Sequence, residues 1–329
     1  MNFDDLNIPA SVWDSADFVV SNARDVSINE TNLDALAVKV RQRFAQGFDN
    51  VEEAFGSTND LIKDVNLVFF ETAANFCFWS QDVSEKWMFD HAGNISGGWY
   101  GLRNAFAAAL ADNIPVHDAT FMSQLNIPQA SKIFKGHDNR QIPLLEWRVN
   151  NIKEAATFLL REHHGSAYNF VESCNFDAPT IAREITIALS SYRDGAWYKN
   201  RWVWILKRAQ ILPGDLSQLT QKYPEFVIHN KDQLTIFADY RLPQVFRHYG
   251  VMEYSLSLSE TVDHKELIPN GSQEEIEIRA ATLVACKKLG KICHDMTLAD
   301  IDVSLWLLSQ DSRGSNDMKP HHMTVSYYY

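Results

Sequence analysis

Apolar residues recur at helical spacing along most of this chain. In residues 31–48 the apolar positions are Leu33, Leu36, Ala37, Val40, Phe44 and Phe48. Charged residues fill the positions between them, so the apolar side chains share one face of a helix. Asn29 or Thr31 can cap the start of that helix. The pattern therefore predicts an amphipathic helix here.

Further helices are predicted where good helix formers follow a turn or a capping residue. The segments that fit are 102–111, 143–161, 178–189, 201–212, 242–249 and 274–289. Ser272 is the expected cap of the last of these, and Glu275 completes a capping box with it.

Extended segments are few and short in this pattern. Residues 66–70, 90–95 and 325–329 are the candidates. A regular alternation of strands and helices is absent from the sequence, which argues against a doubly wound parallel sheet. The expected fold is mainly α, a compact helical domain over residues 1–329 with few short strands. Two tightly packed lobes, about 1–140 and 141–329, are kept as an alternative.

The charge of the chain restricts the class of partner. The 329 residues include 30 basic and 42 acidic side chains, a formal net charge of −12. Because the phosphate backbone dominates affinity for nucleic acids, an acidic surface disfavours duplex binding. We therefore expect a small-molecule substrate and no direct contact with nucleic acid. The sequence leaves the oligomeric state open.

Neither cysteine spacing nor hydropathy points to a metal, a leader or a membrane. The four cysteines are Cys77, Cys174, Cys286 and Cys293, and none forms a C-x-x-C pair. Adjacent histidines such as His321 and His322 usually point apart, so no metal is expected. The acidic N-terminus resembles no signal peptide, and no apolar run reaches the roughly 20 residues of a membrane span. A soluble, cytoplasmic protein is expected.

Two charged residues stand out because each lies inside an apolar run. Lys207 lies in Trp-Ile-Leu-Lys-Arg-Ala-Gln-Ile-Leu, and Asp239 lies in Leu-Thr-Ile-Phe-Ala-Asp-Tyr-Arg. Such residues are rarely buried unless paired, because a lone buried charge is costly. Each is expected on its own helix, where the two meet in space. The pair is either a structural ion pair or a catalytic dyad.

Aromatic and polar residues near glycines or near the dyad are the candidates for substrate binding. Phe76, Trp99 and Tyr100 either pack in the core or form a stacking slot for a flat base. The candidates also include Asp194, Tyr240 and Arg241. Asp194 forms an ordinary Asx turn or faces a ligand cation. Arg241 forms a salt bridge with Asp239 or contacts a phosphate or ribose.

A set of motifs spread over most of the chain resembles the queuosine salvage protein family. The segments are Asn-Phe-Cys-Phe-Trp at 75–79, Ile-Pro-Leu-Leu-Glu-Trp-Arg-Val at 142–149, Tyr-Arg-Asp-Gly at 192–195, Leu-Lys-Arg-Ala-Gln-Ile-Leu at 206–212, Leu-Thr-Ile-Phe-Ala-Asp-Tyr-Arg-Leu-Pro-Gln at 234–244 and Glu-Ile-Arg-Ala-Ala at 277–281. Each motif is weak alone, but their order is that of the family.

The resemblance implies a fold and a reaction. It implies a helical core similar to that of helix-hairpin-helix DNA glycosylases. It also implies hydrolysis of the N-glycosidic bond of queuosine 5'-monophosphate, which releases queuine for tRNA modification, with no cofactor. Lys207 and Asp239 match the catalytic pair. The alternatives are a DNA-type base-excision glycosylase and a non-catalytic helical interaction protein.

Two positions depart from the family pattern. Met323 stands where the C-terminal motif usually has an arginine, and Trp147 stands where an acidic residue is more usual. If that arginine contacts the phosphate, its role is vacant here or is taken by Arg241 or another cation.

The expected mechanism follows from the charge that develops on the ribose. A carboxylate beneath an oxocarbenium-like sugar stabilises it and orients or deprotonates water, which is the role expected of Asp239. Lys207 positions the water or balances charge, and its alternative role is a Schiff-base nucleophile. A 7-deazapurine lacks the ring nitrogen that purine glycosidases usually protonate, so departure depends on hydrogen bonds to the remaining polar edge. Asp194 is the candidate partner of the queuine amine.

Overall fold

The computed structural model describes residues 3, 5–47, 58–79, 86–311 and 318–329, and in them the chain is mainly helical. The helices are α1 (Ala10–Ser21), α2 (Leu33–Ala45), α3 (Leu61–Ala73), α4 (Gly98–Ala111), α5 (Ala119–Ser123), α6 (Ile127–Ile133), α7 (Leu145–Glu162), α8 (Ala167–Ser173), α9 (Ala178–Ala188), α10 (Lys207–Gln218), α11 (Arg241–His248), α12 (Leu256–Asp263), α13 (Gln273–Ile292) and α14 (Leu298–Asp311). The mainly α fold class is confirmed.

The strands are short and pair two by two in antiparallel fashion. They are β1 (Val26–Ile28), β2 (Met88–His91), β3 (Asn94–Gly97), β4 (Gly195–Tyr198), β5 (Arg201–Trp204) and β6 (Met252–Tyr254). The pairs β2–β3 and β4–β5 are hairpins. In the third pair, Val26 lies opposite Tyr254, which joins the N-terminal part of the chain to its last third.

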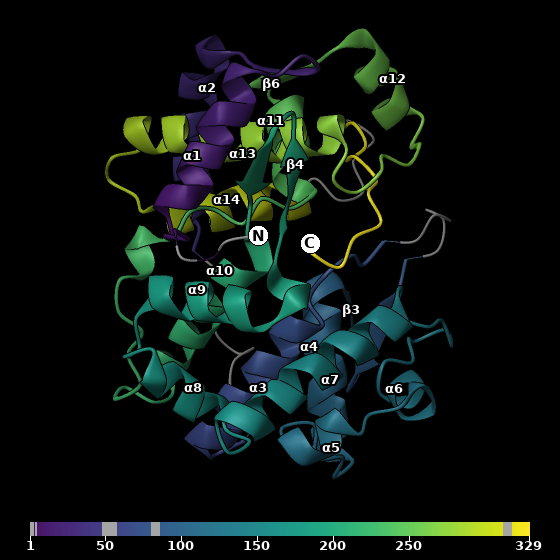
Figure 1. Cartoon of the computed structure of the whole chain (residues 1–329). Helices are drawn as coiled ribbons and strands as arrows, with labels where there is room; N and C mark the ends of the chain where they lie inside the picture. The colour runs from purple at the N-terminus through teal and green to yellow at the C-terminus, as the bar shows by residue number, and fades with distance from the viewer. Residues whose placement is uncertain (1–2, 4, 48–57, 80–85, 312–317) are drawn as a thin grey trace.

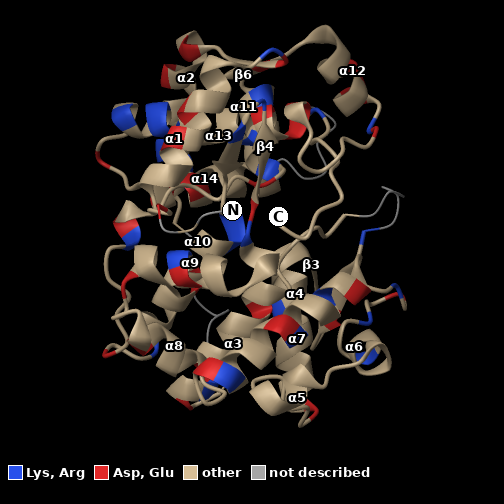
Figure 2. Ribbon diagram, viewed as in Figure 1, with Lys and Arg blue, Asp and Glu red and all other residues tan. Residues whose placement is uncertain are grey.

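Helices from the two ends of the chain pack together. Helices α1 and α2 lie against α13 and α14 in the upper half of the molecule, with α11 beside them, whereas α3 to α9 form the lower half (Figure 1). The upper half therefore contains helices from both ends of the chain. Lys and Arg are interspersed with Asp and Glu over both halves (Figure 2).

Side-chain caps fix where several helices begin. Asp60 accepts a hydrogen bond from the Lys63 backbone N–H at the start of α3, and Ser272 accepts one from Glu275 at the start of α13. The predicted Ser272 cap is thus confirmed. The Glu275 carboxylate accepts from the backbone N–H of Gly271 rather than that of Ser272, so the capping box is not formed.

Three local expectations are wrong. The predicted helix over 201–212 is instead strand β5 followed by α10, because its first half is a run of aromatic and branched residues that suits a hairpin. Residues 66–70 are buried within α3 rather than extended. Residues 325–329 form no strand but an irregular C-terminal segment. Among the described helices, none is long and apolar enough to cross a membrane.

Candidate active site

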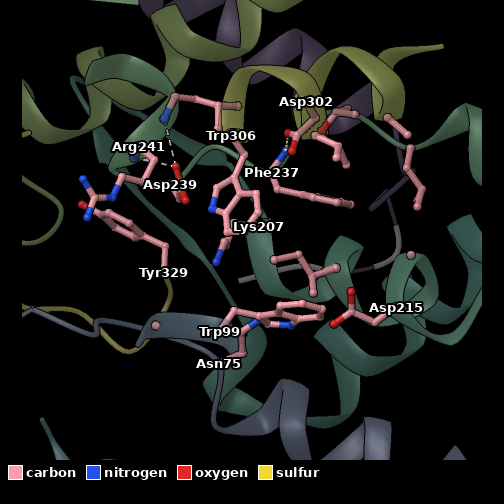
Figure 3. A pocket seen from close by; sticks show the side chains of 18 of the residues that line it. Asn75, Trp99, Lys207, Asp215, Phe237, Asp239, Arg241, Asp302, Trp306 and Tyr329 are labelled. Carbon is pink, nitrogen blue, oxygen red and sulfur yellow. Dashed lines mark hydrogen bonds between the residues drawn. The ribbon is translucent and has the colours of Figure 1, made fainter. Parts of the chain in front are cut away.

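A cavity of about 480 Å³ lies where the two halves of the molecule meet. Its walls come from α4 and α10 on one side, and from the segment before α11 and from α14 on the other (Figure 3). The C-terminal residue Tyr329 closes part of it. The volume falls in the range of small-molecule sites, and aromatic residues such as Phe78, Trp99 and Trp306 are part of its wall.

Lys207 is the first residue of α10 and points into this cavity. Leu206, the residue before it, has a left-handed backbone with φ of 55°, which turns the chain sharply from β5 into the helix. The Lys207 side chain is almost fully buried. Burial lowers the pKa of its ammonium group, and the Asp239 carboxylate acts in the opposite direction.

Asp239 lies just before α11 rather than on a helix of its own. Its Oδ1 atom accepts hydrogen bonds from the backbone N–H groups of Arg241 and Leu242, at 2.6 and 3.1 Å. A carboxylate at a helix start is stabilised by these N–H groups and by the helix dipole. The cap fixes one oxygen of Asp239, and the carboxyl group lines the cavity.

Lys207 and Asp239 face the same cavity without an ion pair. Within the part of the chain that the structure describes, the Lys207 ammonium makes no hydrogen bond or salt bridge to Asp239 or to any other residue. A structural pair would be expected to close the distance between its charges, since unpaired burial is costly. The open arrangement leaves room for a ligand or water between them and favours the catalytic interpretation.

Arg279 of α13 links the segments that carry the two residues. Its guanidinium donates to both oxygens of Asp194, each at 2.7 Å, and its Nε donates to the carbonyl of Ala238 at 3.1 Å. Asp194 also accepts from the backbone N–H of Lys207 at 2.9 Å. One buried arginine therefore sets the position of Lys207 relative to Asp239.

Asp194 does not take the role expected of it. Both of its oxygens are engaged by these bonds, its exposed fraction is 1%, and it is absent from the described lining of the cavity. The Tyr-Arg-Asp-Gly motif at 192–195 therefore contains a buried charge that positions the start of α10, and this charge is not aimed at a ligand. An amine-binding role for Asp194 is therefore not supported.

Replacing Arg279 with methionine is expected to lower the free energy of unfolding by about 3–5 kcal/mol, because it leaves the Asp194 carboxylate buried without its partner. Urea denaturation checks this value. Lys288→Met is the control, since Lys288 pairs with Glu30 at a partly exposed site and should change stability little. Equal effects of the two substitutions would contradict a positioning role for the buried pair.

The predicted aromatic residues all line the cavity. Trp99 and Tyr100 lie in the first turn of α4 and line the cavity. Trp306 of α14 lies on the opposite side of the cavity from Trp99 (Figure 3). The rings of Tyr100 and Trp306 have centroids 5.7 Å apart. Phe76 is nearly fully buried in the cavity wall. Trp99, Tyr100 and Trp306 therefore offer flat apolar faces for a base, whereas the buried Phe76 ring does not take the stacking role expected of it.

Two buried arginines hold the loop that carries Phe76. Arg148 donates to the carbonyls of Phe76 and Cys77 at 2.6 and 2.9 Å, and Arg208 donates to the carbonyl of Ala73 at 2.6 Å. The Arg148 guanidinium also lies over the Phe76 ring, 4.4 Å from its centroid. The loop after α3 is thus fixed by side chains from α7 and α10.

Two further carboxyl groups in the cavity were missed by the sequence analysis. Burial raises the pKa of Asp215 to about 6, against the effect of nearby cations and a hydrogen bond from Trp99. Burial raises the pKa of Asp302 to about 8, although its Oδ2 accepts from the Phe237 backbone N–H at 2.7 Å. Asp302 is thus largely protonated at neutral pH and able to donate a hydrogen bond.

Tyr240 and Arg241 both line the cavity, as predicted. The Arg241 side chain forms no salt bridge with Asp239 among the described contacts, and its Nη1 donates to Gln244 at 3.1 Å. The Tyr240 ring lies 4.7 Å from that of His321 in the C-terminal segment. Arg241 therefore contacts Asp239 through its backbone N–H, and its guanidinium points away from the Asp239 carboxylate.

The two residues that depart from the family pattern, Met323 and Trp147, lie in different parts of the molecule. Met323 is buried in the C-terminal segment and lines a neighbouring cavity, whereas Trp147 is partly exposed on α7 and packs against Tyr327. Over the described residues, no group of three or more His, Cys, Asp or Glu side chains is arranged to hold a metal ion.

Comparison with known proteins identifies a family. The model of the queuosine salvage protein family matches residues 56–329. Three similar proteins carry the name queuosine 5'-phosphate N-glycosylase/hydrolase. The protein from Sphaerobacter thermophilus is 30% identical over 80% of this chain and 81% of its own length. The protein from Bos taurus is 28% identical over 96% of this chain and 98% of its own length. The protein from Dictyostelium discoideum is 32% identical over 78% of this chain and 75% of its own length. This chain belongs to the queuosine salvage protein family.

Proposed function

We propose that this chain hydrolyses the N-glycosidic bond of queuosine 5'-phosphate and releases queuine. The relatives named for this reaction span most of the chain. The observation that carries the assignment to the cavity is that Lys207 and Asp239 face one apolar-walled space without pairing with each other. Both lie in the segment matched by the family model.

In the proposed mechanism Asp239 lies beneath the ribose. As the bond from C1' to the base breaks, positive charge grows on the sugar, and the carboxylate stabilises it. Asp239 also orients or deprotonates the water that adds to C1'. The products are queuine and ribose 5-phosphate. The cap that holds one oxygen of Asp239 keeps the carboxylate in place without reorganisation during the reaction.

Lys207 is proposed to position the attacking water and to balance the charge of Asp239. Its lowered pKa is also compatible with a Schiff-base nucleophile. Positioning is the better interpretation, because hydrolysis of a free nucleotide does not require that the sugar be held covalently.

Departure of the base is proposed to use a neutral carboxyl group of the cavity. A 7-deazapurine retains polar atoms on its pyrimidine ring, and a protonated carboxyl can donate a hydrogen bond to one of them as negative charge develops there. Asp302 is the candidate, since it lines the cavity and burial raises its pKa to about 8, whereas Asp215, with a pKa of about 6, is mostly ionised at neutral pH. The rings of Trp99, Tyr100 and Trp306 would hold the base by stacking.

We also propose that the helices around the cavity form one glycosylase-like domain whose core is related to helix-hairpin-helix DNA glycosylases. A direct contact with nucleic acid is not part of the proposal, in keeping with the net charge of −12.

The proposed substrate is tested by incubating the purified chain separately with queuosine 5'-phosphate, guanosine 5'-phosphate and duplex DNA that contains uracil. Chromatography with mass detection should find a released base with the first substrate only. Release of uracil from the duplex would instead support the DNA-type glycosylase. A folded protein that releases no base from any of the three would support the non-catalytic alternative.

A further inference from the structure

Residues 318–329 form an irregular segment that runs from the upper half of the molecule to the boundary between the halves (Figure 1). Near the start of the segment, the carbonyl of Lys319 accepts a hydrogen bond from the Gln244 side chain of α11 at 2.7 Å. At its other end, the carbonyl of Tyr329 accepts from the backbone N–H of Cys77 at 2.9 Å, in the loop after α3. The segment is therefore bonded to both halves of the molecule.

The side chain of Tyr329 is buried where this segment meets the active-site cavity. Its exposed fraction is 2%, and it lines the cavity on the same side as Asp239 (Figure 3). The guanidinium of the buried Arg279 lies over its ring, with Cζ 3.9 Å from the ring centroid. A cation over an aromatic face is attracted by the negative face of the ring, and more strongly where both groups are shielded from water.

This contact matters because the edges of the same guanidinium already hold the segments that carry the dyad. Arg279 donates to both oxygens of Asp194, which in turn accepts from the backbone N–H of Lys207. It also donates to the carbonyl of Ala238, the residue before Asp239. These bonds lie at the edge of the guanidinium and leave its faces open. The tyrosine ring covers one face, so it opposes movement out of the plane and keeps water from competing for the N–H groups.

The hydroxyl of Tyr329 is engaged within the protein rather than aimed at a ligand. It lies 3.2 Å from Nε2 of His322, and the Glu275 carboxylate is another neighbour. Burial raises the pKa of the phenol well above its ordinary value, so the hydroxyl keeps its proton. A role in acid–base chemistry is therefore not expected of this residue, and its contribution lies in the face of its ring.

We propose that Tyr329 is a positioning residue of this active site. Its ring holds the guanidinium of Arg279 in place, and that guanidinium sets the geometry of Lys207 and Asp239. This assignment rests on the proposed function. Because Tyr329 belongs to the segment 318–329, docking of that segment and the alignment of the two dyad residues form one coupled unit.

Kinetics of two substitutions at Tyr329 tests the role of the ring. Tyr329→Leu removes the aromatic face and should lower kcat for queuosine 5'-phosphate about 10- to 100-fold, with KM within about threefold of the wild type, because misalignment affects the transition state more than binding. Tyr329→Phe keeps the face and should retain kcat within about threefold. All rates are measured at a temperature at which circular dichroism shows each variant to be folded.

Tyr327→Leu is the matched control in the same segment. The Tyr327 ring packs against Trp147 of α7, and Tyr327 is not among the described residues of the cavity lining. This variant should keep wild-type kcat even if it loses stability. The proposal would be overturned if Tyr329→Leu kept wild-type kcat, or if Tyr329→Phe or the control lost as much activity as Tyr329→Leu.

A double-mutant cycle tests the contact with Arg279 without any substrate. Urea denaturation is measured for Tyr329→Leu, for Arg279→Lys, which keeps a positive charge beside Asp194, and for the double variant. The loss of stability in the double variant should be smaller than the sum of the two single losses, because either substitution alone removes the same contact. Additive losses would overturn the proposal. Absence of turnover by the wild type would remove the proposed function, whereas the cycle still supports or overturns the contact itself.

Discussion

Replacement of Asp239 with asparagine is expected to lower kcat for queuosine 5'-phosphate by about 10³-fold or more, with little loss of affinity for the intact nucleotide. Asparagine keeps an Oδ1 acceptor for the backbone N–H groups of Arg241 and Leu242, so the start of α11 is retained. What is lost is the negative charge beneath the ribose and the group that activates water. Steady-state rates and calorimetric affinity measure the two effects separately.

Asp118→Asn is the matched control for this substitution. Asp118 caps α5 through a hydrogen bond from the Phe121 N–H at 2.7 Å, and it is not among the described residues of the cavity lining. The control should keep wild-type kcat. A kcat within tenfold of the wild type for Asp239→Asn would show that this carboxylate does not stabilise the transition state.

Replacement of Lys207 with methionine is expected to lower kcat by about 10²–10⁴-fold without loss of stability. Burial lowers the pKa of Lys207 below that of the unfolded chain. At a pH between the folded and the unfolded pKa of Lys207, the unfolded state binds more protons than the folded state, so the free energy of unfolding rises with pH. At a pH below both values the lysine is charged in the folded state, and its burial lowers the free energy of unfolding. Methionine removes that cost and keeps most of the side-chain volume.

The combination of lost activity and retained stability separates the catalytic from the structural role. If Lys207 formed a structural pair with Asp239, its removal would leave an uncompensated buried carboxylate and destabilise the protein. Lys153→Met, at an exposed site on α7, is the control for both the activity and the stability measurement. Reduction with borohydride during turnover adds a chemical test: a stable adduct on Lys207 would contradict the positioning role and support a Schiff base.

The helical fold class was predictable because it rests on local periodicity. The apolar stripe in α2 and the Ser272 cap of α13 are visible in the sequence, and the structure has both. The stretch around Trp204 was mistaken for helix, since an aromatic and branched run suits either state. Residues 66–70 favour a strand by composition, but the cap at Asp60 and burial on all sides make them part of α3.

That Lys207 and Asp239 meet in one cavity was predictable for a different reason. A lysine or aspartate inside an apolar run must be paired, solvated or functional, and Lys207 and Asp239 both reach the cavity. Asp194 instead lies in the turn-like segment Tyr-Arg-Asp-Gly, and its partner Arg279 lies 85 residues further along the chain. Nothing in the local sequence indicates that partner. Asp302 was missed because its neighbours give it the pattern of an ordinary amphipathic helix.

The central claim, that Asp239 in this cavity drives hydrolysis of queuosine 5'-phosphate, is tested most directly by following free queuine. The purified wild type and Asp239→Asn are incubated with the nucleotide, and the products are separated by chromatography and identified by mass. We expect queuine and ribose 5-phosphate from the wild type and no queuine from the variant. Release of queuine at similar rates by both proteins, or by neither while both are folded, would contradict the claim.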